Sequence, residues 1–540
     1  MNTPMKTLLL TLVSLGLFNV CAFGQQPVIE KSGERAPDSK AAGSQPSPPK
    51  SFEMTTVAQA GRSLFELGAV TAAENAAAAE SSAKSHVSGL PKPLRVGLVR
   101  TVGQTFGPAS FISPASPPLP GEEKLGLMAF RSPGATALRL RFVNFDMGGG
   151  AVTVYTRDGD EVITRGPFSG KGPEHDGDFW TASLPGDTIY IEVSGVDEPR
   201  LEIAEVMHLD QDPIATARRQ RRLSQSRDHG ATVNAVAELG CHLDVMCETV
   251  VDASARDATA QLTFQVGMQA KACTGTILTD LDGDTLVPYL LTANHCNITA
   301  ANVGSLQATF LFQSNSCGGA PPASMPSLMG GVVLETNGDN DMRFIRLNGV
   351  LPAGVTPARW STGGPPDGSY GIHHPGGTFK RATFFDPSSY IFCSYTYDSD
   401  YWVMEARRGG IEPGSSGSGL FNPTGQLVGH LRGRCGPDTD EEGGNCSTDD
   451  GWRAVYGKFS VTHGVIRRWL EIGGTINVNR FHGGSELGTP SEPYRTVTAG
   501  YNLAWDNTRL KIKPGNYNES VTFSKPMTIL ADGGTVIIGR

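Results

Sequence analysis

The cysteines of this 540-residue chain constrain its fold more than any other feature. Nine are present, and all except Cys21 fall within one central segment. An even number of cysteines confined to one segment of an exported chain predicts disulfides rather than free thiols. A zinc site is the weaker alternative, because no close pair of cysteines faces a second close pair. The candidate disulfide cysteines are Cys241, Cys247, Cys273, Cys296, Cys317, Cys393, Cys435 and Cys446.

The N-terminus has the pattern of a signal peptide. Lys6 precedes an apolar run over residues 8–18, and small residues follow at Ala22 and Gly24. We therefore predict a signal peptide over residues 1–24 and a secreted protein, extracellular or periplasmic. The residues before Cys21 lack the small side chains of a lipoprotein site. No stretch of the chain has the roughly 20 apolar residues that a membrane span requires.

Composition favours β structure and argues against nucleic acid as a partner. Gly (66) and Pro (36) are plentiful and charged residues make up only 18%, which favours turn-rich β structure over long helices. The formal net charge is -9 and the sequence has no basic stripe that would bind phosphates. The one dense basic cluster, residues 218–222, is better explained as part of a cleavable linker.

Residues 25–235 are expected to form a propeptide. Its first part, to about residue 90, is rich in Ala, Ser and Pro and predicts a flexible or partly helical lead-in. From about 94 to 209, short alternating runs such as 138–142 and 188–193 predict an antiparallel β-sandwich. This part has no cysteine and no cluster of catalytic residue types. We expect it to act on its own protease as an inhibitor or folding aid.

The remaining chain divides into two further parts. Residues 236–475 contain the cysteines and many short β runs, and they end on an amphipathic helical pattern at 464–470. Residues 476–540 contain short strands with sharp turns, at 510–513, 528–530 and 536–538. That pattern resembles the first coils of a parallel β-helix, of which only two or three would fit.

Three short motifs in the central segment indicate nucleophilic catalysis. His295 follows an apolar strand and precedes Cys296, Asp341 precedes the apolar run 342–347, and Ser416 is centred in a Gly-Ser turn. Asp339 is a rival for the acid. The order His, Asp, Ser is that of chymotrypsin-like enzymes. Each motif alone has an ordinary structural explanation, but the ordered set predicts a serine protease.

The residue types of these motifs match the chemistry of peptide-bond hydrolysis. His295 would remove the proton of the Ser416 hydroxyl and later protonate the leaving amine, while Asp341 would fix the imidazole tautomer. The backbone N–H groups of Gly414 and Ser416 would form an oxyanion hole, each contributing about 3 kcal/mol. This reaction needs no cofactor and no metal, so we expect neither.

At this level of detail the central segment resembles the bacterial lysyl endopeptidase family of trypsin-like proteases. The resemblance covers about residues 236–472. Five short segments carry it: the Cys-x5-Cys at 241–247, Cys-Thr-Gly at 273–275, Ile-His-His-Pro at 372–375, Glu-Pro-Gly-Ser-Ser-Gly-Ser at 412–418 and Tyr-Gly-Lys-Phe at 456–459.

The resemblance implies a fold, a substrate class and a disulfide pattern. The fold would be a chymotrypsin-like double β-barrel, and the substrates would be proteins or peptides cleaved after Lys or Arg. The implied bridges are Cys241–Cys446, Cys247–Cys317 and Cys273–Cys296. Cys393 and Cys435 are extra to the pattern and could pair with each other, and Cys435 competes with Cys446 for Cys241.

The specificity pocket is where the sequence departs from the family. Lysyl endopeptidases hold an aspartate two residues before the Tyr-Gly pair, and Ala454 occupies that position here. Asp449 and Asp450 could substitute for it if their loop folds inward. His430 and Arg432 lie on or beside the expected pocket wall and would instead favour an acidic side chain. A buried substrate cation needs a carboxylate partner, so a preference for Lys or Arg depends on Asp449 and Asp450.

Two further expectations concern activity. Ser415 precedes the nucleophile and cannot form an ion pair with a new N-terminal amine, so activation should remove a covering propeptide by cleavage between Arg218 and Cys241.

The alternative to an enzyme is a non-catalytic binding protein on a protease scaffold. The complete set of three catalytic residues argues against that alternative.

Overall fold

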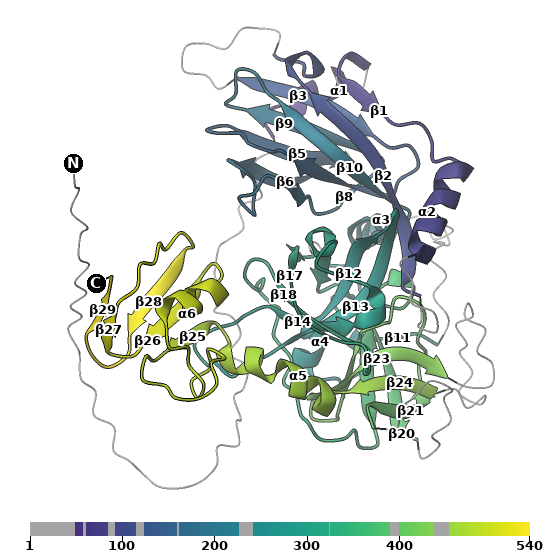
Figure 1. The fold of residues 1–540 in the computed structure, drawn as a ribbon. Helices are drawn as coiled ribbons and strands as arrows, with labels where there is room; N and C mark the ends of the chain where they lie inside the picture. The colour runs from purple at the N-terminus through teal and green to yellow at the C-terminus, as the bar shows by residue number, and fades with distance from the viewer. Residues whose placement is uncertain are drawn as a thin grey trace, which may run out of the picture. The chain divides into compact units, whose positions relative to one another are not determined.

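The computed structural model describes residues 49–57, 61–84, 92–114, 124–158, 161–225, 241–322, 325–388, 399–435 and 453–539. The predicted signal peptide lies outside these ranges. Within these ranges the chain forms two compact units, one built from the described residues up to Leu278 together with Pro288–Thr462, and the other from Thr279–Val287 and the described residues from His463 onward. Strands dominate both units, as the composition predicts (Figure 1).

The N-terminal β-rich domain is a sandwich of largely antiparallel sheets. Its five-stranded sheet has the order β1-β3-β9-β5-β6 and faces strands β2, β10, β4, β7 and β8. Aromatic and aliphatic side chains from both sheets, among them Phe130, Phe142 and Ile191, form the core between them. The strands are β1 (Leu64–Glu66), β2 (Leu94–Phe106), β3 (Leu125–Arg131), β4 (Ala137–Val143), β5 (Ala151–Asp158), β6 (Glu161–Ser169), β7 (Phe179–Trp180), β8 (Leu184–Pro185), β9 (Thr188–Ser194) and β10 (Leu201–Leu209).

This domain begins earlier than the sequence pattern indicated. β1 pairs in parallel with β3, and Ser51 donates its N–H to Glu192 and contacts Tyr155 through its hydroxyl. Part of the expected lead-in is therefore packed into the sandwich. Three helices accompany it: α1 (Thr55–Val57), α2 (Ala72–Lys84) and α3 (Pro213–Gln225).

Two β-barrels follow in the same unit, in the arrangement of a chymotrypsin-like protease. The first contains β12 to β18 and the second contains β11 and β19 to β24. Their bounds are β11 (Leu243–Asp244), β12 (Thr259–Val266), β13 (Gln269–Leu278), β14 (Tyr289–Ala293), β15 (Gln307–Phe310), β16 (Ser327–Met329), β17 (Gly331–Asn337), β18 (Met342–Leu347), β19 (Ser369–His373), β20 (Arg381–Pro387), β21 (Tyr401–Arg408), β22 (Gly419–Phe421), β23 (Leu427–Cys435) and β24 (Arg453–Lys458), with the helix α4 (Ala253–Ala258) before β12.

The sandwich and the first barrel share one continuous sheet. β2 pairs with β10 along most of its length, and its first residues pair with β13 of the barrel. The apolar cluster at this junction takes side chains from both sides, including Val96 and Met207 from the sandwich and Ala270 and Ala272 from β13. The two folds therefore form one structural body within their unit.

The C-terminal part consists of short parallel strands, as the sequence predicted. β25 (Thr475–Val478), β26 (Thr508–Ile512) and β28 (Met527–Ala531) pair in parallel, as do β27 (Gly515–Tyr517) and β29 (Val536–Ile538). α6 (Val497–Leu503) packs against β25 and β26. The helix α5 (Phe459–Ile472), which follows the second barrel, contains the predicted amphipathic run. None of the helices within the described ranges combines the length and hydropathy of a membrane span.

Candidate active site

His295 stands where β14 ends. All five residues of β14 are buried, and the strand passes directly into a single 3-10 turn, Asn294–Cys296. Cys296 is bridged to Cys273 on β13, which ties this turn to the neighbouring strand. The imidazole of His295 is therefore held by a strand on one side and a disulfide on the other.

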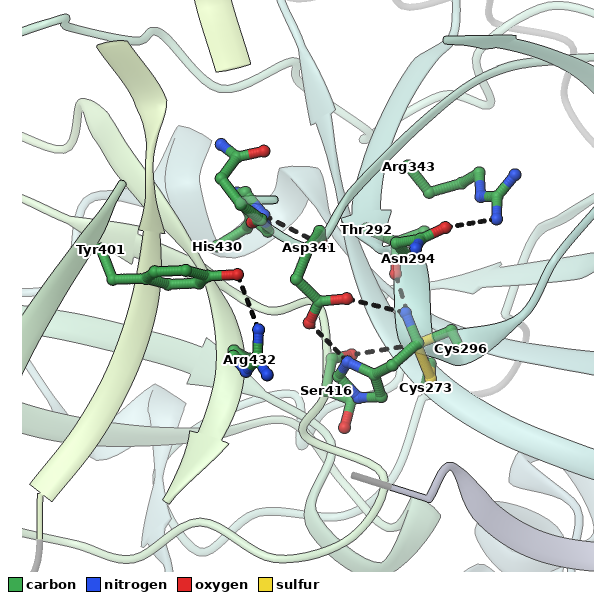
Figure 2. A network of polar contacts seen from close by, with 12 residues as sticks. Cys273, Thr292, Asn294, Cys296, Asp341, Arg343, Tyr401, Ser416, His430 and Arg432 are labelled. Atoms are coloured by element: carbon green, nitrogen blue, oxygen red, sulfur yellow. Dashed lines mark hydrogen bonds and ion pairs between the residues drawn. A yellow bond between two sulfur atoms is a disulfide. The ribbon is translucent and has the colours of Figure 1, made fainter. Parts of the chain in front are cut away.

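Asp341 orients the imidazole. Its carboxylate lies 2.6 Å from His295 Nδ1 and also accepts the backbone N–H of His295 at 2.8 Å (Figure 2). Its backbone carbonyl accepts the N–H of Asn294 at 2.8 Å. Asp341 is fully buried and has a left-handed backbone (φ 58), which directs its side chain toward His295. The rival Asp339 is exposed, and its described hydrogen bonds involve only its backbone: the carbonyl accepts from the Tyr401 hydroxyl and the N–H donates to Asn337 Oδ1.

Two buried residues hold the segment that carries Asp341. His430 Nε2 lies 2.9 Å from the carbonyl of Asn340 and 3.2 Å from that of Asp341. Asn340 donates its side-chain amide to Thr462 Oγ1 at 2.9 Å. Burial lowers the pKa of His430, so the neutral ring is favoured and its Nε2–H is available to donate to these carbonyls. His430 therefore holds the backbone of the segment that carries Asp341.

Ser416 lies in a tight turn against the segment that carries His295, with its carbonyl oxygen 3.9 Å from Cys296 Sγ (Figure 2). The turn has two glycines in the left-handed region, Gly414 (φ 99) and Gly417 (φ 82). A Cβ on Gly417 would come within 2.2 Å of Thr292 Oγ1, so only glycine allows this close approach to β14. The N–H of Thr274 on β13 donates to the Ser416 carbonyl at 2.8 Å and so anchors the turn to β13.

The site has the polar groups that acyl transfer requires. With Nδ1 donating to Asp341, the lone pair of His295 is on Nε2, which is buried and has no hydrogen-bond partner among the described residues. The N–H groups of Gly414 and Ser416 make no backbone hydrogen bond within the described chain. These free donors beside a serine hydroxyl can stabilise a developing oxyanion.

A second buried network holds the turn at Ser415. The Ser415 hydroxyl lies 2.9 Å from His373 Nδ1 and accepts the N–H of Glu412 at 3.2 Å. The other ring nitrogen of His373 lies 2.9 Å from Thr383 Oγ1. Burial lowers the pKa of His373 well below its usual value, so the network is neutral. The turn is thus positioned without an ion pair, as expected from the serine at position 415.

The candidate pocket residues are in different environments. Arg432 donates to the Tyr401 hydroxyl at 2.7 Å and lies over the Tyr401 ring, 5.2 Å from its centroid. Ala454 is fully buried in β24. His430 faces the Asp341 segment, so its Nε2 is not free for a substrate side chain. Asp449 and Asp450 lie outside the described residues, and the basis of specificity stays a prediction.

Two of the predicted disulfides are present. Cys247 is bonded to Cys317 and Cys273 to Cys296, as the resemblance implied. Cys241 is also disulfide-bonded. Cys393 and Cys446 lie outside the described residues, and only the backbone of Cys435, at the end of β23, is described. No three His, Cys, Asp or Glu side chains in the described ranges are grouped to hold a metal ion.

Sequence reasoning missed several residues of the site. It included His373 only within the Ile-His-His-Pro motif, and it assigned His430 to the pocket wall rather than to the Asp341 segment. Thr274 was noted only as part of a family motif, although it also donates its hydroxyl to the Gly414 carbonyl at 2.8 Å. Nothing in the local sequence indicates these contacts, because each joins segments that are distant along the chain.

The site lies in a segment that matches a known family. The family "Lysyl endopeptidase, C-terminal domain" matches residues 237–447, which include all three candidate catalytic residues. The match confirms the resemblance for this segment. This segment is therefore similar to a lysyl endopeptidase domain, and the similarity supports a serine endopeptidase.

Solved protease structures share partial similarity with the chain. The HtrA-type protease AlgW with tripeptide is 17% identical, with a TM-score of 0.29 over 41% of this chain and 62% of that one, so under two thirds of AlgW is spanned. The inactive Ser343Ala form of Rv3671c from M. tuberculosis is 14% identical (TM-score 0.28, 42% and 91% covered). A scabies mite inactivated protease paralogue is 13% identical (TM-score 0.30, 40% and 94% covered).

Proposed function

We propose that this chain is the precursor of a secreted serine endopeptidase that hydrolyses protein substrates through an acyl-enzyme. One observation carries the proposal: Asp341 lies 2.6 Å from His295 Nδ1, while the buried Nε2 of the same ring has no hydrogen-bond partner among the described residues, in the segment that Ser416 contacts. That geometry leaves one nitrogen free to accept the serine proton and the other held by a carboxylate.

The reaction follows from these positions. His295 Nε2 takes the proton of the Ser416 hydroxyl as its oxygen attacks the scissile carbonyl, and the imidazolium that forms is stabilised by Asp341. The N–H groups of Gly414 and Ser416 donate to the oxyanion. The imidazolium then gives its proton to the leaving amine, and water hydrolyses the acyl-enzyme by the reverse sequence.

We further propose that the enzyme prefers Lys or Arg as the residue immediately before the scissile bond. This preference is supported by the match to the lysyl endopeptidase family, and Asp449 and Asp450 are the candidate partners for the substrate cation. Cleavage of a peptide library varied at the residue before the cut tests it. Cleavage after Lys or Arg is expected, whereas cleavage only after Glu or apolar residues would overturn it.

Labelling with a fluorophosphonate tests the nucleophile directly. The probe forms a covalent bond with an activated serine and not with an ordinary hydroxyl, so we expect a single adduct on Ser416, located by mass spectrometry. Ser416→Ala is the matched control and should remain unlabelled. An adduct on another serine would move the nucleophile away from Ser416, whereas no adduct in the mature enzyme would favour a non-catalytic binding protein.

A further inference from the structure

The first residues of β2 lie on an edge of β13 that the barrel itself leaves open. β12 covers one edge of β13 from Gln269 to Thr276. On the other edge β14 pairs only with Thr276–Leu278, and β2 pairs with Gln269–Ala272 (Figure 1). A strand of the N-terminal domain therefore completes a sheet edge of the protease barrel.

This edge adjoins the catalytic turn. Thr274, two residues beyond Ala272 on β13, donates to the carbonyls of Ser416 and Gly414 at 2.8 Å each. Two residues of a strand span about 7 Å. Leu94 is the partner of Ala272 in the ladder, so β2 begins opposite a position only two residues from Thr274, the residue that holds the catalytic turn.

The Leu94 side chain also reaches the loop behind the oxyanion donors. A Cβ on Gly377 would lie 3.3 Å from Leu94 Cδ2. A Cβ on Gly414 would lie 3.0 Å from the nitrogen of Gly377. Leu94, Gly377 and Gly414 are therefore successive neighbours, which places the Leu94 side chain against the loop that contacts Gly414.

The chain direction of β2 past the catalytic turn is the one that the leaving-group segment of a bound substrate would have. In any peptide substrate the leaving-group segment is C-terminal to the scissile bond, so it runs away from the nucleophile in the N-to-C direction. β2 does the same, because Leu94 pairs with Ala272, near the turn, and Leu98 pairs with Gln269, farther away. His295, which would protonate the leaving amine, is next to Cys296, and Cys296 is bridged to Cys273 on β13. The leaving-group side of the site therefore adjoins β13.

We propose that β2 is an inhibitory strand, which in the uncut precursor occupies the edge of β13 that the leaving-group segment of a polypeptide substrate needs. The inference rests on the proposed function. β-strand addition to an open edge is a general mode of peptide binding, in which backbone hydrogen bonds supply the affinity. Here the added strand belongs to the protein itself and excludes competing peptides.

Other contacts keep the strand in place after the linker is cut. Arg139 of β4 is buried and donates to the carbonyl of Ser305, in the barrel, at 2.7 Å. Gln307 of β15 exchanges hydrogen bonds with Ser183 of the sandwich, at 2.9 Å to its nitrogen and 3.1 Å to its hydroxyl. With the apolar cluster around Val96, these contacts hold the N-terminal domain independently of the covalent link. Cleavage of the linker alone should therefore not activate the enzyme.

A nicked precursor tests the proposal. A recognition site for a site-specific protease is placed between residues 226 and 240 of the full chain, and the chain is cut there. Cleavage of a peptide with at least four residues after the scissile bond is then measured. We expect the nicked complex of Leu94→Asp to cleave this peptide at least tenfold faster than the nicked parent, because a carboxylate cannot replace the apolar contact at Gly377.

The matched control is Thr101→Asp, at an exposed position of β2 that pairs with β10 and not with β13. It should leave the nicked complex as slow as the parent. Leu94→Ala gives a smaller change in case the aspartate prevents folding, and a roughly threefold gain is expected. Size-exclusion chromatography shows that the domains remain bound during the assay.

Two results would overturn the inhibitory strand. One is a nicked parent that, with its N-terminal domain still bound, cleaves the peptide as fast as Leu94→Asp. The other is a pair of Leu94 variants that are no faster than Thr101→Asp. Fluorophosphonate labelling separates this from failure of the proposed function: if Ser416 is unlabelled even in the mature enzyme freed of its N-terminal domain, the protease assignment fails.

Discussion

At the scale of single residues, Asp341 and Asp339 provide a paired test of the triad. Asp341→Asn should keep the packing but favour the wrong imidazole tautomer, which costs kcat about 10⁴-fold in a related triad. Asp339→Asn changes an exposed side chain with no described contact and should leave kcat within about twofold. Steady-state kinetics on one peptide substrate compare the two. Equal losses would show that His295 is not oriented by Asp341.

His373 should act as a positioning residue for the catalytic turn. His373→Ala removes the partner of the Ser415 hydroxyl, so the N–H donors of the turn shift and kcat should fall about 10²-fold with little change in KM. Ser415→Ala removes the other half of the same hydrogen bond. The double variant should therefore lose no more than either single variant, because the two act as one unit. Additive losses would contradict a shared role.

The residues of the site could be predicted only where a local motif carries them. His295, Asp341 and Ser416 each lie in a short segment with its own pattern, and their order along the chain predicted the mechanism. Asp341 was preferred to Asp339 because it directly precedes the apolar run 342–347, and the structure adds the left-handed backbone and the contacts with His295. His430 and His373 were not assigned their contacts, because each joins segments brought together only by folding.

At the scale of elements, the two described disulfides should have different consequences. In the chain-entropy account, removing Cys273–Cys296, with a separation of 23 residues, costs about 3 kcal/mol, and removing Cys247–Cys317, with a separation of 70, costs about 4 kcal/mol. Only the first bridge adjoins His295. The paired Ala variants should thus both lower the urea midpoint, while the Cys273/Cys296 variant should lose the larger share of kcat. The reverse order of activity loss would contradict this account.

Most elements of the barrels and the parallel strands of the tail followed from alternating runs and turn residues. The pairing of β2 with β13 did not, because it joins strands about 170 residues apart and depends on which edge β14 leaves open. The early start of the sandwich was missed for a related reason. β1 is only three residues long, and its pairing with β3 is visible only in the folded sheet.

At the scale of the whole molecule, buried histidines should make the precursor sensitive to acid. Burial lowers the pKa of His374 to about 3 and that of His373 well below its usual value. Above pH 6.5 both are neutral in the folded and unfolded chain, so they add no pH dependence. Below pH 6.5 only the unfolded chain takes up protons, and each histidine should cost about 2 kcal/mol of stability between pH 7 and pH 5.

Urea unfolding of the Ser416→Ala precursor at the two pH values measures this loss without autolysis. His374→Gln should remove about half of the pH dependence that the pair contributes. His175→Gln, at an exposed position of the N-terminal domain, is the control and should leave the pH dependence unchanged. A stability that does not fall between pH 7 and pH 5 would show that these rings are protonated in the folded chain.

The central claim is that Ser416, activated by His295, is the nucleophile of a serine endopeptidase. The most direct test compares peptide hydrolysis by the mature enzyme and by Ser416→Ala, with the disulfides and circular dichroism of both checked first. The claim predicts a loss on the order of 10⁴-fold or more, with the fold intact. A correctly folded Ser416→Ala enzyme that retains substantial hydrolysis would contradict it.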